Sequence, residues 1–292
     1  MLNHLDKDTA LQKRLEDIEI VYTDLDGTLL GRGGTLLIDG EGSPSARTAQ
    51  AVVAANSAGL KIVPVTGRSC AQLTEITRLC GWTDYIAELG SIRSTFADGE
   101  RTFTFDTPEW RKPLPHGVTP LDIIRESQVV DKLAEAFPGR IEYHTPWHVH
   151  RQASEVLRGY LDRQQALEII DDLDVKLSLI DNGVITPRKH TLDPSDEPIR
   201  AYHIAPAGVS KQRAIALELK ERGINPKHAL MIGDAPSDLK CSEVVFTVLV
   251  ENALRSPGLE KRLERDDNAC LVTGISGDGW ARVIDAVLAK RG

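Results

Sequence analysis

Short apolar runs alternate with helical segments between residues 18 and 89. Residues 18–24, 60–65 and 85–89 are apolar runs of strand length, and residues 45–58 and 69–80 between them have helical periodicity. This strand, helix, strand, helix, strand order predicts a parallel α/β sheet. Ligands of open α/β sheets bind at the carboxyl edge of the strands, so the polar residues that follow these runs are candidates for a functional site.

The alternation stops near residue 90 and resumes after Pro206. The section between has alternating runs and the dipeptide Asn182-Gly183, a strong hairpin signal, which together predict an α+β unit with an antiparallel sheet. Such an interruption indicates an inserted domain. We therefore predict an α/β fold, with a Rossmann-like parallel-sheet core from residues 1–89 and 202–292 and an inserted α+β domain from residues 90–201.

Length and composition narrow the class of protein. The 292 residues leave room for one large or two ordinary domains, and 41% hydrophobic with 27% charged residues is typical of a soluble globular protein. A net charge of −8 argues against a general nucleic-acid binder. Four scattered cysteines, a polar stretch over residues 1–17 and the lack of a long apolar run predict a cytoplasmic protein without a signal peptide or a membrane partner.

The segment Asp24-Leu25-Asp26-Gly27-Thr28 follows the first apolar run directly. Asp-Gly is a common turn signal, so the segment could simply end a strand. A calcium loop of the EF-hand type would need an acidic or amide residue at Thr28 and a glutamate at Thr35, which excludes that reading. The remaining interpretation is a pair of catalytic carboxylates at the end of a buried strand.

Four further polar residues follow other predicted strands or begin the next helix: Thr66, Lys211, Asp234 and Asp238. An aspartate such as Asp24 can attack phosphorus and carry the phosphoryl group. Lys211 and Thr66 offer the cation and the hydrogen-bond donor that its transition state needs. Carboxylates at Asp24 and Asp234 suit Mg²⁺, which prefers oxygen ligands. The set predicts phosphoryl transfer.

In this order the segments resemble the four motifs of the haloacid dehalogenase-like (HAD) hydrolases. The matching segments are Asp24–Thr28, Val65–Arg68, Lys211 and Gly233–Asp238. The insertion between the second and third motifs is similar to that of the Cof-type branch, which includes sucrose-phosphate phosphatase-like and phosphomannomutase-like enzymes. The resemblance covers the whole chain and implies that the inserted unit is a cap domain.

The resemblance also implies a role for each matching residue. Asp24 would be the nucleophile and Asp26 the acid and base. Asp238 would anchor the metal's waters or Lys211. The implied Mg²⁺ ligands are Asp24, the backbone carbonyl of Asp26, Asp234 and Asp238. The implied phosphate-binding residues are Leu25, Gly27, Thr66, Gly67, Arg68 and Lys211.

The function so implied is a Mg²⁺-dependent phosphatase acting on a small phosphorylated metabolite, such as a sugar or polyol phosphate. A phosphomutase and a non-catalytic sugar-phosphate sensor are the alternatives. The sequence departs from the branch at Pro236, where a glycine or variable residue is usual, and at Ser237, where asparagine is usual. It also departs at Leu89-Gly90, where asparagine and glycine are common. Because the acidic and basic groups are intact, we expect activity to survive.

Three histidines and Arg188 in the insertion, and Arg68 before it, are candidate binding residues. His144, His148 and His150 share strand parity, so they either bind a metal or form an exposed or substrate-facing surface. Arg188 begins the basic segment Arg188-Lys189-His190, which either steers a phosphorylated substrate or is a solvated loop. Arg68 has the same two readings, a substrate contact or a surface salt bridge.

Overall fold

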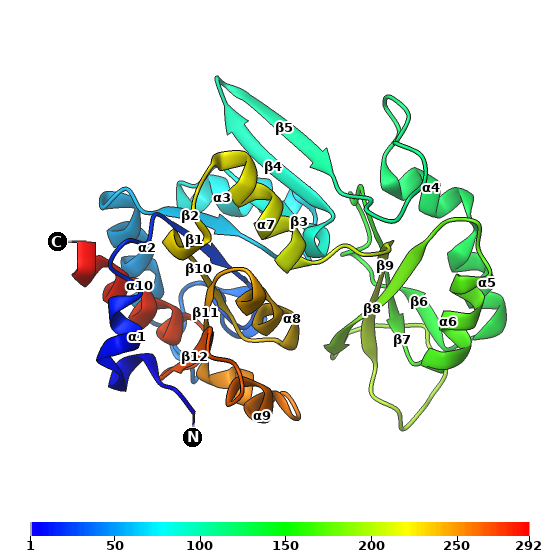
Figure 1. Cartoon of the computed structure of the whole chain (residues 1–292). Coiled ribbons are helices and arrows are strands. Elements are labelled where there is room, and N and C mark those ends of the chain that lie inside the picture. Colours follow the sequence, from blue (N-terminus) through cyan, green and yellow to red (C-terminus); the bar gives the residue numbers. More distant parts are fainter. Residues whose placement is uncertain (1, 292) are drawn as a thin grey trace. The chain divides into compact units, whose positions relative to one another are not determined.

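The computed structural model describes residues 2–291, which form two compact units. The first unit contains the chain up to Gly67, Leu73–Thr102 and the chain from Ser210 onward, and the second contains Arg68–Gln72 and Phe103–Val209. Figure 1 follows the chain through both units.

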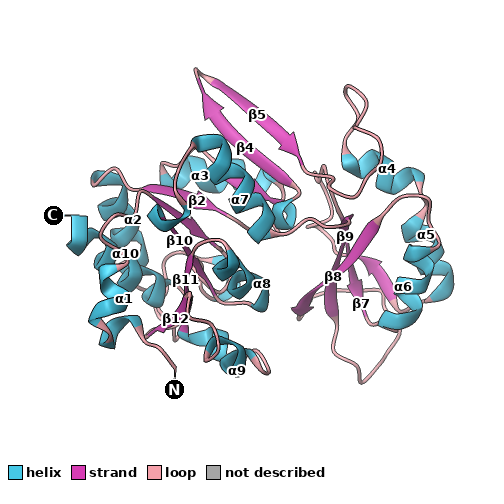
Figure 2. Ribbon diagram, in the orientation of Figure 1, coloured by secondary structure: helices cyan, strands magenta, loops and turns pink. Residues whose placement is uncertain are grey.

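A five-stranded parallel sheet forms the centre of the first unit. Its strand order is β12-β11-β10-β1-β2, and all neighbouring strands are parallel. The strands are β1 (Ile20–Thr23), β2 (Lys61–Pro64), β10 (Ala229–Gly233), β11 (Phe246–Val250) and β12 (Ala269–Val272). Strands β1 and β2 fall within the predicted apolar runs 18–24 and 60–65, and β10, β11 and β12 lie after Pro206, where the alternation was expected to resume. The predicted α/β class with a parallel-sheet core is confirmed (Figure 2).

Helices pack on this sheet through apolar side chains. Ala214, Ile215 and Leu219 of α7 share a buried cluster with Ile20 and Met231 of the sheet. Helices α2 and α10 pack against each other. The helices of this unit are α1 (Thr9–Lys13), α2 (Arg47–Ser57), α3 (Cys70–Cys80, which begins in the second unit), α7 (Lys211–Arg222), α8 (Pro236–Leu239), α9 (Leu259–Leu263) and α10 (Gly277–Arg291).

Short 3-10 helices complete the connections of the first unit. They are η1 (Leu5–Lys7), η2 (Arg32–Gly34), η3 (Glu88–Gly90), η4 (Pro226–His228), η5 (Lys240–Glu243) and η6 (Glu251–Arg255). Within residues 2–291, no helix combines the length and the apolar character needed to cross a bilayer.

The third predicted strand of the parallel sheet belongs to a different sheet. Strand β3 (Tyr85–Ala87) pairs with β4 (Ile92–Ala97) in the three-stranded sheet β3-β4-β5, which β5 (Glu100–Phe105) completes. A single parallel bridge between Val65 and Ile86 links β3 to the chain just after β2. Strand β4 is buried at its start and exposed at its end, and because it has no continuous apolar run the sequence did not predict it.

The second unit contains an antiparallel sheet of order β6-β7-β9-β8. Its strands are β6 (Ile141–Tyr143), β7 (Glu155–Gly159), β8 (Leu177–Val184) and β9 (Arg200–Pro206), and its helices are α4 (Pro120–Glu126), α5 (Val129–Ala136) and α6 (Arg163–Asp171). Leu133 of α5, Ile170 of α6 and Leu157 of β7 belong to one buried cluster. The predicted α+β character of the insertion is therefore present.

Two local predictions in the second unit were wrong. The sequence predicts one helix near residues 123–136, but the structure has two, interrupted at Gln128, whose φ of 55° is left-handed. Asn182-Gly183 does not turn the chain, because β8 continues through it with a register shift between Asp181 and Val184. Gly183 has a positive φ, which here allows a β-bulge within β8 rather than a hairpin turn.

The three histidines of the insertion do not share a strand face. Strand β6 ends at Tyr143, and the cis bond Thr145–Pro146 begins a turn that contains His148 and His150. The His148 ring stacks on the Tyr143 ring, with centroids 4.9 Å apart. The groups of His, Cys, Asp or Glu side chains in residues 2–291 that could hold a metal do not include these histidines. The prediction that the three histidines share one strand face was therefore wrong, and the metal site that it suggested loses its basis.

The unit boundaries differ from the predicted junctions. Residues up to Thr102 belong to the first unit, and all of β9 lies in the antiparallel sheet of the second. The division into a catalytic core of residues 1–89 and 202–292 and a cap of residues 90–201 remains a prediction.

Candidate active site

The loop after β1 carries the first two predicted carboxylates. The Asp24 N–H still donates to Ile232 O at 2.9 Å, so Asp24 continues the parallel ladder with β10. The chain then turns back, with Thr28 N and Leu30 N donating to Leu25 O at 3.2 and 2.7 Å. The turn places Asp24 at the carboxyl edge of the sheet with its side chain buried and leaves Asp26 exposed.

Gly27 fits this turn for two reasons. Its φ of +86° is unfavourable for other residues, and a Cβ built there would lie 2.3 Å from Asp234 Oδ2. Its N–H donates to Leu30 O at 2.9 Å, so this group is already used within the turn. The phosphate contact expected of Gly27 remains a prediction.

Lys211 lies at the centre of the buried charges. It is the first residue of α7, which Ser210 caps by accepting from Arg213 N at 3.1 Å. Lys211 Nζ donates to Asp24 Oδ1 at 2.6 Å and to Asp238 Oδ1 at 2.7 Å. One ammonium group thus binds two buried carboxylates from different loops of the first unit.

Asp238 connects this ammonium to the loop after β10. Its Oδ2 accepts from the N–H groups of Asp234 and Ala235, both at 3.0 Å, at the start of the short helix α8. A Cβ at Gly233 would lie 2.3 Å from the Asp238 Cβ, so this loop leaves no room for a side chain there. The Gly-Asp-x-x-x-Asp spacing therefore has a direct structural reason.

The Asp234 carboxylate receives one donor on each oxygen. Thr28 Oγ1 donates to Oδ1 at 3.1 Å, and Asn252 Nδ2 donates to Oδ2 at 2.9 Å. Asn252 was missed at the sequence level. The signal was present, because it follows the apolar run of β11 in the same way that Asp24 and Asp234 follow β1 and β10.

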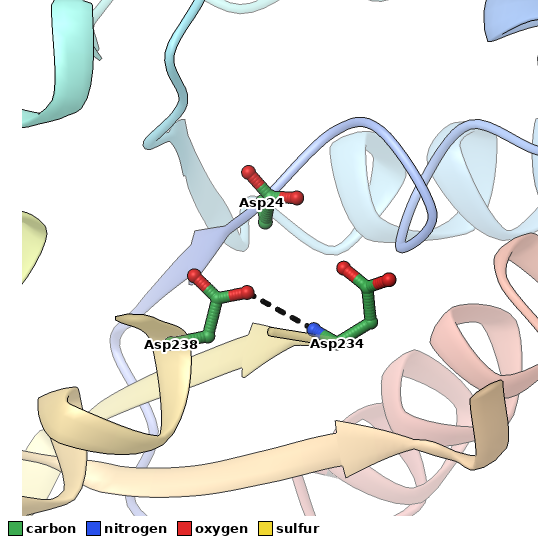
Figure 3. Close-up of side chains that lie close together, drawn as sticks. All are labelled: Asp24, Asp234 and Asp238. Atoms are coloured by element: carbon green, nitrogen blue, oxygen red, sulfur yellow. Dashed lines mark hydrogen bonds between the residues drawn. The ribbon is translucent and has the colours of Figure 1, made fainter. Parts of the chain in front are cut away.

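Asp24, Asp234 and Asp238 form a cluster that fits a divalent cation. Each offers a carboxylate oxygen, and the three oxygens lie within 4.8 Å of one another (Figure 3). Three carboxylates against one ammonium leave excess negative charge in a largely buried place. Oxygen donors in this number suit Mg²⁺, which keeps several of its own waters.

Burial and mutual repulsion change the proton affinities in this cluster. Burial raises the pKa of Asp24 well above its usual range, and Asp238 and Asp234 add to this against the opposing effect of Lys211. Burial and then Asp238 raise the pKa of Asp234 to about 7. Burial alone would lower the pKa of Lys211, but the carboxylates of Asp238 and Asp24 outweigh it and raise the pKa. The cluster therefore favours any additional positive charge.

Thr66 follows β2 at the same edge of the sheet, since Pro64 of β2 pairs with Thr23 of β1. The Thr66 N–H donates to Ile86 O at 3.1 Å, and its carbonyl accepts from Leu89 N at 3.0 Å, which fixes the loop. Leu89 adopts a left-handed φ of 60° where the branch often has asparagine.

Other predicted site residues are placed less directly. Gly67 and Arg68 are half-buried after Thr66, and Leu25 is fully buried. Ser237 is exposed at the start of α8, and Arg188 is exposed in the second unit. Contacts bring Asp24, Lys211, Asp234 and Asp238 together directly, whereas the roles expected for Arg68 and Arg188 remain predictions.

Comparison with known proteins bears on the fold. No family model and no curated protein sequence matches the chain. Solved structures do match over nearly all of it. A haloacid dehalogenase-like hydrolase from Bacteroides thetaiotaomicron is 14% identical, with a TM-score of 0.59 over 92% of this chain and 99% of its own.

Two further matches are described as phosphatases. One, a phosphatase of the HAD superfamily from the same organism, is 17% identical, with a TM-score of 0.59 over 93% of this chain and 96% of its own. The other, the sucrose-phosphatase from Synechocystis in complex with sucrose and phosphate, is 13% identical, with a TM-score of 0.57 over 93% and 98%. The chain has the fold of the haloacid dehalogenase-like hydrolases, as its motifs predicted.

Proposed function

We propose that this protein is a Mg²⁺-dependent phosphatase that hydrolyses a small phosphorylated metabolite through an aspartyl-phosphate. The observation that carries the proposal is the cluster of buried Asp24, Lys211 and Asp238 with half-buried Asp234 at the carboxyl edge of the parallel sheet. This site, and not the fold, carries the proposal, because one fold hosts many activities.

In the first step, an Asp24 carboxylate oxygen attacks the phosphorus of the monoester. Lys211 binds Oδ1 of this carboxylate at 2.6 Å, so we assign the attack to Oδ2. The new bond joins Asp24 to phosphorus, and the bond from phosphorus to the alcohol oxygen breaks. Asp26 gives its proton to this oxygen, and the free alcohol leaves.

In the second step, water attacks the phosphorus of the aspartyl-phosphate. Asp26, now a carboxylate, accepts the water's proton, the bond to Asp24 breaks, and inorganic phosphate leaves. Asp26 is exposed two residues beyond Asp24, which suits a group that must gain and lose a proton in each turnover.

Positive charge and hydrogen-bond donors stabilise both steps. Lys211 supplies a fixed ammonium group, and Thr66 supplies a donor at the neighbouring strand end. Asp24, the Asp26 carbonyl, Asp234 and Asp238 would hold Mg²⁺, either directly or through its waters. A bound Mg²⁺ supplies charge that reduces the repulsion between Asp24 and the substrate phosphate.

We propose a sugar or polyol phosphate as the substrate class. Support comes from the fold shared with a sucrose-phosphatase solved with sucrose and phosphate. The second unit, including Arg188, is the proposed source of specificity. A phosphomutase would use the same aspartyl-phosphate, so the products distinguish the two: inorganic phosphate for one, an isomeric sugar phosphate for the other.

The test is phosphate release from p-nitrophenyl phosphate and from a panel of phosphorylated metabolites, with and without Mg²⁺. The wild-type protein should be active only with the metal. Asp24→Asn should abolish activity while retaining the circular dichroism spectrum, and the exposed Asp17→Asn should behave as wild type. Substantial turnover by Asp24→Asn would refute the assignment of the nucleophile.

A further inference from the structure

Asn252 connects three loops of the first unit through one side chain. It lies in η6, directly after β11. Its Nδ2 donates to Gly27 O and to Asp234 Oδ2, both at 2.9 Å. Its Oδ1 accepts from Ser276 N at 2.8 Å. All hydrogen-bonding groups of the amide except one oxygen lone pair are therefore used.

The orientation of this amide follows from its partners. A backbone N–H can only donate, so the atom facing Ser276 must be the oxygen. A carbonyl and a carboxylate can only accept from it, so the atom facing Gly27 and Asp234 must be the nitrogen. A flipped amide would lose all three hydrogen bonds, so asparagine fits here in one orientation.

Asn252 is itself held by the turn before α10. Glu251 N donates to Gly274 O at 3.0 Å, and Gly274 N donates to Glu251 Oε2 at 2.8 Å. Ser276 has a left-handed φ of 49° and Gly274 one of 111°. This turn presents the Ser276 N–H to Asn252, so the amide has a fixed support on the side away from the carboxylates.

The two acceptors of Asn252 belong to the two loops that carry the proposed chemistry. Asp234 comes from the loop after β10, and its other oxygen accepts from Thr28 Oγ1 at 3.1 Å. With one donor on each oxygen, the carboxylate cannot rotate freely. Gly27 O lies one peptide beyond Asp26, so the same amide also restrains the residue proposed as acid and base.

We propose that Asn252 is a positioning residue that holds the Asp234 carboxylate and the Gly27–Thr28 peptide, next to Asp26, in register for a divalent cation. The inference rests on the proposed function only in naming the cation and the reaction. Partners of this kind orient metal-binding carboxylates, and their loss typically weakens metal binding about 10–100-fold.

The first test measures binding of Mn²⁺ alone, by the loss of the free-ion electron paramagnetic resonance signal. Asn252→Ala should weaken Mn²⁺ binding about 10–100-fold relative to wild type. Arg255→Ala is the matched control, because Arg255 is an exposed residue of the same short helix η6 and does not belong to the turn that holds Asn252. It should bind Mn²⁺ within about threefold of wild type, since exposed substitutions away from a site usually have small effects. Wild-type affinity in Asn252→Ala, or an equal loss in Arg255→Ala, would overturn the inference.

A second test adds Thr28→Val, which removes the donor on the other Asp234 oxygen. Because the two donors restrain one carboxylate, the fold-loss of Mn²⁺ affinity in the double variant should differ from the product of the fold-losses in the two single variants. With p-nitrophenyl phosphate at saturating metal, Asn252→Ala should lower kcat more than it raises KM. A wild-type protein that binds Mn²⁺ but releases no phosphate would refute the proposed function while leaving the role of Asn252 in place.

Discussion

Replacing Lys211 by methionine tests the buried charge cluster most directly. Lys211 Nζ lies 2.6 Å from Asp24 Oδ1 and 2.7 Å from Asp238 Oδ1, and the exposed fractions of the three side chains are 5%, 10% and 0%. Methionine fills similar space without the charge. The variant therefore leaves two buried carboxylates without their ammonium partner, although Asp238 keeps its two backbone donors.

The expected loss of stability in Lys211→Met is large. Removing one partner of a buried ion pair typically destabilises a protein by about 3–5 kcal/mol. At roughly 2–4 °C per kcal/mol for chains of this size, the Tm should fall by roughly 6–20 °C. The loss should be smaller at acidic pH, because burial raises the pKa of Asp24 and the protonated carboxyl tolerates the missing charge.

The assay is thermal unfolding by circular dichroism in the presence of a chelator. Lys220→Met, an exposed change on the same helix, is the matched control and should shift the Tm by no more than about 2 °C, since such surface substitutions usually change stability by less than 0.5 kcal/mol. A Tm for Lys211→Met that equals the control value would refute the reasoning. Added Mg²⁺ should restore part of the lost stability, because it replaces positive charge at the same carboxylates.

Two further predictions concern the loops and the pH dependence of the first unit. Gly27→Ala should lower the free energy of unfolding by more than the approximately 1–2 kcal/mol of a left-handed φ, because the new Cβ also meets Asp234. Gly59→Ala is the control for the backbone cost alone, since Gly59 has a φ of +65° and open space around it. Equal losses of stability for the two variants in urea denaturation would contradict the steric argument. Burial alone would raise the pKa of Asp84, but contacts from Lys61, Phe96 N and Arg222 outweigh it and lower the pKa. Its contribution to stability is present above the unfolded pKa of about 3.9 and is lost as pH falls through the folded value. The free energy of unfolding should therefore fall less steeply with acid in Asp84→Asn, and an unchanged slope would count against this group.

The parallel sheet was predictable because its strands are buried on both faces. Continuous apolar runs marked these strands, and the carboxylates of the cluster follow two of them: Asp24 follows β1, and Asp234 and Asp238 follow β10. The site was predictable because the carboxyl ends of parallel strands meet at one edge of the sheet, so residues from distant parts of the sequence come together there.

The features that were missed depend on tertiary context. Strand β4 is partly exposed and carries no apolar run, and Asn182-Gly183 forms a bulge because β8 pairs with β9 on both sides of it. The parity of the three histidines had meaning only if one strand contained them all, and β6 ends before the first. Asn252 follows the apolar run of β11, but it carries no charge, and its role becomes evident from its contacts.

The strand order also has a consequence for synthesis of the chain. The interior strand β1 pairs with β2 on one side and with β10 on the other, and β10 is made long after β1. During synthesis, one edge of β1 stays unpaired until residue 233 has left the ribosome. The continuous segment Phe103–Val209 can fold before that point. We expect nascent chains that stop before β10 to need chaperone protection and to aggregate without it.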